Sequence, residues 1–316
     1  MHTPPSTFFT FRRAAPGLAA ASLALLGGCT GLGTAPTASS PTTTSATAVS
    51  PAVSPAAWPA RLQALLPADV LLLGEKHDAA EHQQWQRDTV QAMAARGQLA
   101  AVVMEMAEQG HSTTGLPRDA TEAQVQAALQ WKDAAWPWKA YGPVVMAAVA
   151  AGVPVWGGNL PRARMRDAMA DTAWDRHLPA PALQRQYEAL REGHCGLLPE
   201  SQIAPMARIQ IARDAAMART ATEARVSGQT VLLIAGGGHV LRSLGVPTHL
   251  PAGLTSKVAL AQAGEAQAAV KKEAPANMNA DTDADADAIV ATPALPAKDH
   301  CAELREQWGK GANPAR

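Results

Sequence analysis

The sequence predicts an α/β protein, with a mostly parallel sheet covered by helices on both faces. Short and almost continuously apolar runs, at 70–73 and 231–235 for example, alternate with longer segments of helical periodicity. This alternation is typical of parallel sheets, and strands without polar positions indicate burial on both faces. We expect a single domain, preceded by a disordered tether and interrupted near its C-terminal end by a disordered insertion.

Taken in order, the apolar runs predict strands at 70–73, 101–104, 153–156, 230–235 and 257–261. Helical periodicity predicts helices at 80–95, 122–130, 143–151, 161–170, 182–190 and 205–225. Thr121 is a good N-cap for the second helix, and Pro161 suits the first position of the fourth.

Composition excludes one large class of function. Lys+Arg and Asp+Glu both number 27, so the formal net charge is zero. Nucleic-acid binding needs a basic excess or stripe, and we therefore expect no nucleic-acid partner. Apolar residues make up 47% of the chain, which is enough for a sizeable core.

Residues 1–28 have the features of a lipoprotein signal peptide. A basic pair precedes an apolar run at 18–26 that is too short to span a bilayer. The motif Leu26-Gly27-Gly28-Cys29 resembles a bacterial lipobox, in which the cysteine is lipidated and becomes the new N-terminus. An ordinary cleaved signal peptide is the alternative. Thr30 stands where an Asp would retain the protein at the inner membrane, which favours the periplasmic face of a Gram-negative outer membrane.

Two further segments have biased composition. Residues 29–57 are rich in Ser, Thr, Pro and Ala and are expected to form a flexible tether. Residues 265–297 are rich in Ala and Asp; they lack the glycine turn and closing Glu of a calcium loop and are expected to be disordered. The globular domain is then expected at 58–264, with a C-terminal tail at 298–316.

The cysteines predict one disulfide. If Cys29 is lipidated, Cys195 and Cys301 remain as a pair in an oxidising compartment. Their bond would tie the C-terminal tail to the domain. Two free thiols are the alternative.

Polar side chains follow the predicted strands where each strand ends. Two Gly-x-x-His turns, Gly74 to His77 and Gly236 to His239, come directly after apolar runs. The carboxyl ends of parallel strands share one edge of a sheet, where open α/β proteins place their ligands. We therefore expect six side chains to converge there: Glu75, His77, Glu105, Asn159, Arg162 and His239. Each alone could cap a helix or form an ion pair, but the set predicts a site.

Other sites are excluded by their motifs. The glycine run before His239 lacks the third glycine of a dinucleotide fingerprint, because Leu241 stands there. The chain also has no Walker A lysine pattern, no Gly-x-Ser-x-Gly elbow and no His-Glu-x-x-His helix.

Several motifs occur in an order that resembles the ChaN-type haem-binding lipoproteins of the wider Tiki/TraB-like superfamily. They are Gly74 to Asp78, Val103 to Met106, Trp138 to Pro143, Gly158 to Arg162, His194 to Pro199, Gln210 to Asp214 with Met217, and Gly238 to Val240. The resemblance covers about residues 58–260; the insertion and the triple glycine depart from the family pattern.

The resemblance implies a lipid-anchored haem-binding protein of iron uptake, with an outer-membrane haem receptor as a possible partner. It also implies a homodimer that holds two haems between protomers, with Tyr and His as iron contacts. Tyr141 lies in an aromatic turn with Trp136 and Trp138, which could pack on a porphyrin. His194 is a second candidate ligand. The alternatives are a hydrophobic plug around Tyr141 and a histidine fixed beside a disulfide.

Two classes of function therefore stay open. The first is a haem carrier without turnover, whose cofactor-binding residues would be drawn from Tyr141, His194, His77, His239, Asn159 and Arg162. The second is a metal-dependent hydrolase, which the wider superfamily suggests. In it, His77, His239 and one of Glu75 or Glu105 would hold Mn²⁺, Co²⁺ or Zn²⁺, and the other Glu would act as base. A structural lipoprotein is a third and simpler possibility.

Overall fold

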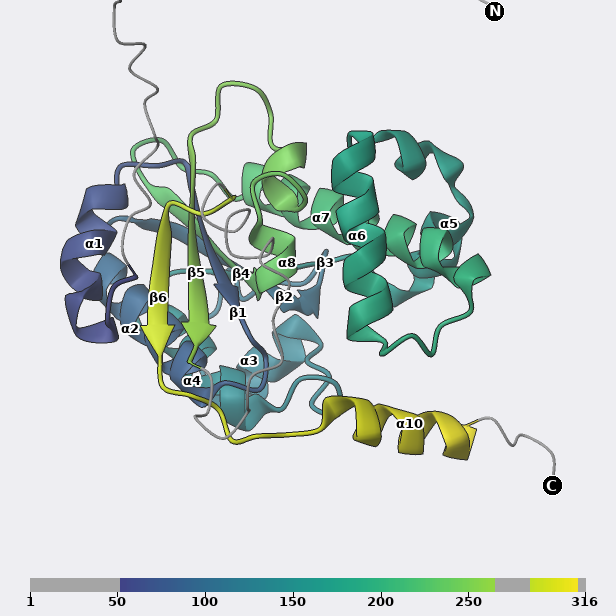
Figure 1. Ribbon diagram of the computed structural model, residues 1–316. Helices are drawn as coiled ribbons and strands as arrows, with labels where there is room; N and C mark the ends of the chain where they lie inside the picture. Colours follow the sequence, from purple (N-terminus) through teal and green to yellow (C-terminus); the bar gives the residue numbers. More distant parts are fainter. Residues whose placement is uncertain (1–51, 265–284, 312–316) are drawn as a thin grey trace, which may run out of the picture. The chain divides into compact units, whose positions relative to one another are not determined.

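The computed structural model describes residues 52–264 and 285–311, which contain one six-stranded sheet (Figure 1). The strand order is β3-β2-β4-β1-β5-β6, and every neighbouring pair is parallel. The predicted fold class is confirmed. The strands are β1 (Val70–Glu75), β2 (Leu99–Glu108), β3 (Val155–Asn159), β4 (Thr230–Gly236), β5 (Ser256–Ala263) and β6 (Ala288–Thr292).

Side chains along the central strands alternate between two cores, one on each face of the sheet. In β1, Leu71 and Leu73 belong to one core, and Val70 and Leu72 belong to the other. Burial on both faces explains why these strands read as continuous apolar runs. Helices α1 (Trp58–Leu65), α2 (Ala80–Ala94), α3 (Glu122–Leu129) and α4 (Trp138–Ala150) cover the first face; α7 (Glu200–Glu223) and α8 (Gly237–Val240) cover the second.

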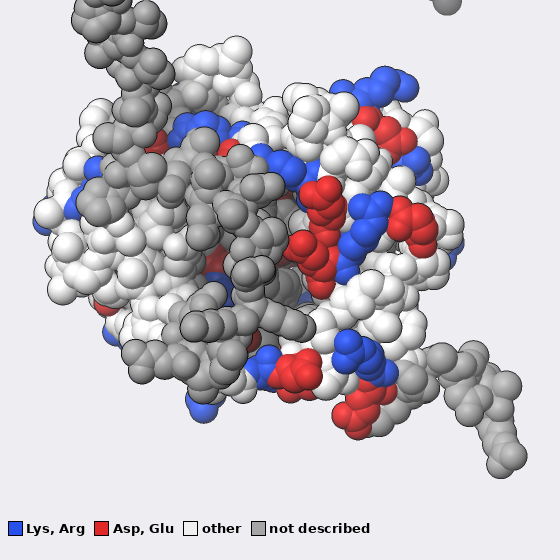
Figure 2. Space-filling view, viewed as in Figure 1, with Lys and Arg blue, Asp and Glu red and all other residues white. Residues whose placement is uncertain are grey.

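The other helices pack outside these two layers. Helices α5 (Met165–Ala170) and α6 (Ala180–Gly193) contact α7. Short 3-10 turns are η1 (Pro55–Ala57), η2 (Arg162–Arg164), η3 (Thr172–Arg176) and η4 (Val246–His249). On the face drawn in Figure 2, basic and acidic side chains lie intermixed, in keeping with the zero net charge. Across the described ranges, no helix combines the length and apolar character needed to cross a membrane.

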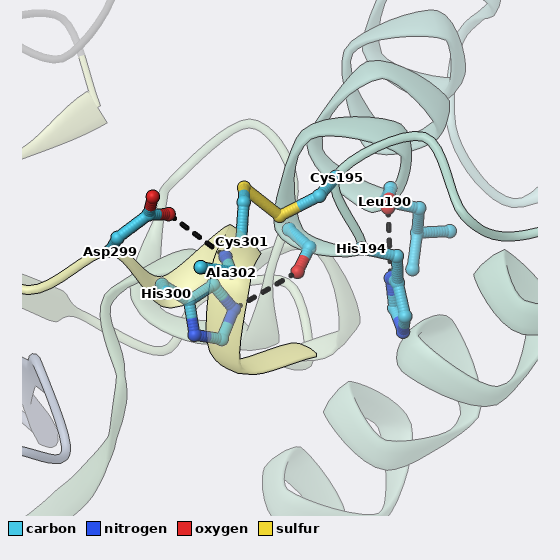
Figure 3. Close-up of a disulfide and its surroundings, with 8 residues drawn as sticks. Leu190, His194, Cys195, Asp299, His300, Cys301 and Ala302 are labelled. Atoms are coloured by element: carbon cyan, nitrogen blue, oxygen red, sulfur yellow. Dashed lines mark hydrogen bonds between the residues drawn. A yellow bond between two sulfur atoms is a disulfide. The ribbon is translucent and has the colours of Figure 1, made fainter. Parts of the chain in front are cut away.

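The predicted disulfide is confirmed. Cys195 follows α6 and is bonded to Cys301 in α10 (His300–Gly311), across a sequence separation of 106 residues (Figure 3). The C-terminal helix is thereby tied to the end of α6.

Two predicted helix starts are wrong for the same reason. The helix predicted at 143–151 begins at Trp138, and the helix predicted at 205–225 begins at Glu200, so Pro143 and Pro205 lie inside helices. A proline inside a helix removes one backbone hydrogen bond and crowds the carbonyl of the residue four positions earlier, and the apolar packing of these helices offsets that cost. The start of α4 is also fixed by the Asp133 carboxylate, which accepts a hydrogen bond from the Trp138 backbone N–H at 2.7 Å.

The prediction of disorder over the whole of 265–297 is also wrong, because β6 lies within that range. This strand pairs with β5, and Val53, in the predicted tether, pairs with Val290 on the other side. Nearby, Asp285 is buried and accepts hydrogen bonds from Arg185. The abundance of Ala and Asp obscures the short apolar run of this strand. The signal peptide, Cys29 and residues 265–284 lie outside the described residues.

Candidate functional site

The two Gly-x-x-His turns leave adjacent strands at the same level of the sheet. Strands β1 and β4 pair with Glu75 opposite Gly236, so both turns begin at the carboxyl edge. Strand β2 flanks β4 on its other side and carries Glu105 to the same edge. A Cβ atom on Gly236 would lie 2.9 Å from His77 Nε2. Glycine at this position therefore permits the close approach of the two turns.

The first histidine, His77, is oriented by the strand that precedes it. Its Nδ1 donates to Glu75 Oε1 at 2.7 Å, because an ionised carboxylate can only accept. Its Nε2 lies 3.8 Å from Glu105 Oε2, and the side chain is 40% exposed. Burial lowers the pKa of His77, but the hydrogen bond with Glu75 and the nearby carboxylate charges outweigh burial and raise it above its ordinary value.

Glu75 is fully enclosed by hydrogen-bond donors. The Tyr141 hydroxyl donates to Oε1 at 2.7 Å, and the amides of Gln83 and Gln86 donate to Oε2 at 2.9 and 2.6 Å. Tyr141 is itself buried; burial and then the Glu75 charge raise the pKa of its phenol far above the usual value. These donors fix the carboxylate, and the carboxylate fixes His77.

Glu105 lies between the two histidines. Its Oε1 is 3.5 Å from His239 Nε2, and its Oε2 accepts the backbone N–H of Gly236 at 2.8 Å. Burial alone would raise the pKa of this carboxyl. The charges of His239 and His77, with the Gly236 hydrogen bond, hold the pKa below the ordinary value. Glu105 is therefore a buried anion shared by both turns.

The second histidine, His239, is oriented by a helix. Asp214 of α7 accepts from its Nδ1 at 2.6 Å, and the His239 side chain is only 13% exposed. Burial lowers the pKa of His239, but the charges of Asp214 and Glu105 raise it to about 9. Burial raises the pKa of Asp214 to about 6, against the effect of His239. At neutral pH, His239 is a buried cation between two carboxylates.

A cavity of about 450 Å³ lies beside this cluster. Trp136 lines it and contacts His77 edge-on, with ring centroids 4.8 Å apart. Its walls combine apolar and basic side chains from the ends of β2 and β3, the loop before α4, and α7. They are Glu105, Met106, Ala107, Glu108, Gln130, Lys132, Ala134, Ala135, Trp136, Asn159, Leu160, Arg162, Met165 and Arg213.

The remaining predicted site residues fall in different places. Asn159 donates to the backbone carbonyl of Glu105 at 2.8 Å, and Arg162 lines the cavity. His194 instead caps the end of α6 beside the disulfide, with its Nδ1 2.8 Å from the Leu190 carbonyl oxygen (Figure 3). Its contacts within the described residues are with this region and not with the cluster.

Three functional side chains escaped the sequence analysis. Gln83 and Gln86 lie on one face of the helix after the first turn, a spacing of three that could have indicated a shared acceptor. Arg213 gave no such signal, since it reaches the cavity only through the packing of α7. Within residues 52–264 and 285–311, no group of three or more His, Cys, Asp or Glu side chains is arranged to hold a metal ion.

A parallel α/β fold with a polar cluster and a cavity at its carboxyl edge defines a ligand-binding class of protein. Residues 61–250 match the family described as haem-binding uptake, Tiki superfamily, ChaN, and the chain belongs to that family. Among curated proteins, no relative matches.

One solved structure has a similar fold. The chain is similar to ChaN of Campylobacter jejuni, described as showing cofacial haem binding, at 23% identity and a TM-score of 0.52, covering 65% of this chain and 85% of that one. More distant likenesses are the type III effector HopBA1 (15% identity, TM-score 0.40, 72% and 88% covered) and a Bacillus cereus protein (14%, 0.34, 68% and 71%). With TM-scores below 0.5, these two likenesses bear on neither the fold nor the function of this chain.

Proposed function

We propose that this protein binds haem in the cavity beside Glu105, with His77 as an iron ligand, and serves haem or iron uptake. The observation that carries the proposal is the state of His77. Its Nδ1 is hydrogen-bonded to Glu75, and its Nε2 is 3.8 Å from Glu105 Oε2, beyond hydrogen-bond distance, so a ligand could replace that contact. Its ring also contacts Trp136 in the cavity wall. A metal-binding histidine commonly has its other nitrogen fixed in this way.

The cavity suits a porphyrin as well as the iron. Met106, Leu160 and Trp136 supply apolar and aromatic lining, which a flat hydrophobic macrocycle requires. Bound haem would supply an iron centre, which side chains beside the cavity, His77 first among them, would hold. Such attachment suits a protein that must take up haem and pass it on.

The other candidate ligands are less suited to iron. Tyr141 is buried, and its hydroxyl donates to Glu75, so forming a phenolate there is unfavourable. His239 is held between Asp214 and Glu105. We therefore assign His77 the iron contact and Tyr141 the support of Glu75.

A haemin titration of the full-length chain tests the assignment. We expect a saturable Soret band in the wild type, loss or a marked shift of that band in His77→Ala, and an unchanged band in Tyr141→Phe. His194→Ala is the matched control, since it removes a histidine that lies beside the disulfide. A His77→Ala band identical to that of the wild type would refute the iron contact.

The same preparation tests the hydrolase alternative. Elemental analysis showing stoichiometric Mn, Co or Zn, together with no Soret band, would favour a metal-dependent enzyme. The absence of a preformed group of three ligands among the described residues gives this alternative no geometric support.

The proposal includes attachment through Cys29 to the periplasmic face of the outer membrane. The lipobox-like motif supports it. Cys29→Ser should move the protein from the membrane fraction to the soluble periplasm. We further propose that the protein forms a homodimer and that an outer-membrane haem receptor is its partner. A haemin-dependent change in its mass in solution tests the dimer.

A further inference from the structure

Three basic side chains line the cavity without a salt bridge to an acidic side chain in the described residues. Lys132 comes from the loop before α4, Arg162 from η2 and Arg213 from α7. In the described part of the chain, none of the three forms an ion pair. Elsewhere arginines do pair, as Arg208 does with Asp175 at 2.8 Å. Unpaired cations around one cavity point to an anionic ligand.

The acidic side chains of the cavity are already engaged. Glu105 lies between the two histidines, and Glu108 accepts the backbone N–H of Arg162 at 3.3 Å. Neither forms an ion pair with the three cations within the described ranges. The free charge of the cavity is therefore positive.

One wall of the cavity also holds polar atoms without hydrogen-bond partners. Arg213 Nε and Asn159 Oδ1 are both buried and unpaired, although Asn159 Nδ2 donates to the Glu105 carbonyl. Asn159 is only 8% exposed. A buried donor or acceptor left unpaired is costly, so such atoms indicate a missing ligand or water. The guanidinium is the donor geometry that matches a carboxylate.

Resting on the function proposed above, we propose that Lys132, Arg162 and Arg213 bind the ionised propionates of haem. All three cations line the same cavity: Lys132 comes from the loop that also carries Trp136, and Arg162 and Arg213 come from η2 and α7. The apolar lining takes the macrocycle and the cations take its carboxylates. The site therefore selects a porphyrin with free propionates over one whose propionates are esterified.

Haemin and haemin dimethyl ester test this selectivity, because esterification removes both propionate charges and adds only two methyl groups to the same macrocycle. We expect the full-length chain to bind haemin at least about tenfold more tightly than the ester. In the double variant Lys132→Gln/Arg162→Gln, haemin affinity should fall about tenfold while ester affinity stays the same. Both residues are exposed, so the variant is expected to fold, which a thermal melt checks.

Arg164→Gln is the matched control. It removes an arginine from the same 3-10 turn, but Arg164 lines a different cavity. Its affinities for both ligands should equal those of the wild type. Arg213→Lys adds a finer test, since it keeps the charge and loses the planar guanidinium; haemin affinity should fall while ester affinity is retained.

The possible failures are distinguishable. Saturable binding of haemin and ester with equal affinity, or equal selectivity in the wild type and the double variant, refutes the propionate assignment while haem binding stands. No binding of either porphyrin refutes both proposals. An equal loss of affinity in Arg164→Gln would show a general charge effect and also refute the assignment.

Discussion

The two Gly-x-x-His turns occupy matching positions on neighbouring strands, yet their histidines have different surroundings. His77 is 40% exposed and is held by Glu75, two residues before it in the same segment. His239 is 13% exposed and is held by Asp214 from a helix on the second face of the sheet. Both Nε2 atoms face Glu105.

The Gly-x-x-His motif positions each imidazole, whereas the carboxylate that holds its Nδ1 and its degree of burial decide what that histidine does. A half-exposed histidine beside a cavity can exchange its contact with Glu105 for a ligand. A buried cation between two carboxylates cannot be removed without leaving buried charge uncompensated. We therefore expect His77 to matter for ligand binding and His239 for stability.

The largest expected effect separates the two histidines by stability. His239→Ala should lower the free energy of unfolding by about 3–5 kcal/mol, since it leaves buried Asp214 and Glu105 without their shared cation. His77→Ala should cost less than about 1 kcal/mol, because its side chain is 40% exposed and solvent screens its contacts with the carboxylates. Urea unfolding of both variants measures the difference, and equal losses would remove the distinction.

The next effect depends on pH. The pKa of His239 is raised from 6.5 to about 9 in the folded protein. Its contribution to stability is therefore complete below pH 6.5 and lost as pH rises through 9. The free energy of unfolding should fall between pH 7 and pH 9.5 in the wild type and fall less in His239→Ala. If the free energy of unfolding had the same pH dependence in the wild type and in His239→Ala, His239 would not be the group responsible.

A smaller effect concerns the support of the first turn. Tyr141→Phe removes one of the hydrogen bonds to buried Glu75, while Gln83 and Gln86 keep theirs. We expect a loss of about 1.5 kcal/mol in stability. Gln84→Ala, on the exposed side of the same helix, is the control and should change little. An unchanged free energy of unfolding in Tyr141→Phe would show that Gln83 and Gln86 are enough to hold the Glu75 carboxylate.

The smallest effect contrasts the site with a histidine pair elsewhere. His177 and His249 stack with centroids 3.7 Å apart, and burial, then the His177 charge, lowers the pKa of His249 to about 3. Because the pKa of His249 is lower in the folded than in the unfolded protein, its contribution to the free energy of unfolding is complete above pH 6.5 and is lost as pH falls toward 3. His249→Phe should change the free energy of unfolding little at pH 7. Below pH 6.5, the free energy of unfolding of this variant should fall less steeply with pH than that of the wild type. An unchanged acid slope would refute the effect.

Much of the cluster could be predicted from the sequence, because parallel strands bring their carboxyl ends to one edge. The apolar runs before Glu75 and His239 predicted strands of one parallel sheet, and the structure brings His77, His239 and Glu105 together at its carboxyl edge. The disulfide followed from the cysteine count, once Cys29 was assigned to lipid attachment and the domain to an oxidising compartment.

Contacts made by distant packing could not be predicted. Nothing local to Arg213 signals that α7 brings it to the cavity, and nothing local to Tyr141 signals that its hydroxyl meets Glu75 rather than a ligand. Strand β6 escaped because its five residues lie in a segment of biased composition. Arg213 and Tyr141 make contacts with residues more than 50 positions away in the sequence, and the apolar run of β6 is obscured by the Ala and Asp residues around it.

The pairing of Val53 with β6 fixes where the N-terminal segment enters the domain. Four interstrand spacings separate β6 from β2, whose end lines the cavity, a distance of roughly 20 Å. Residues before Val53, which in our proposal lead to the lipid on Cys29, thus join the domain at its far flank. The anchor that we propose would therefore enter the domain at the edge of the sheet that lies four strands away from the strand end lining the cavity.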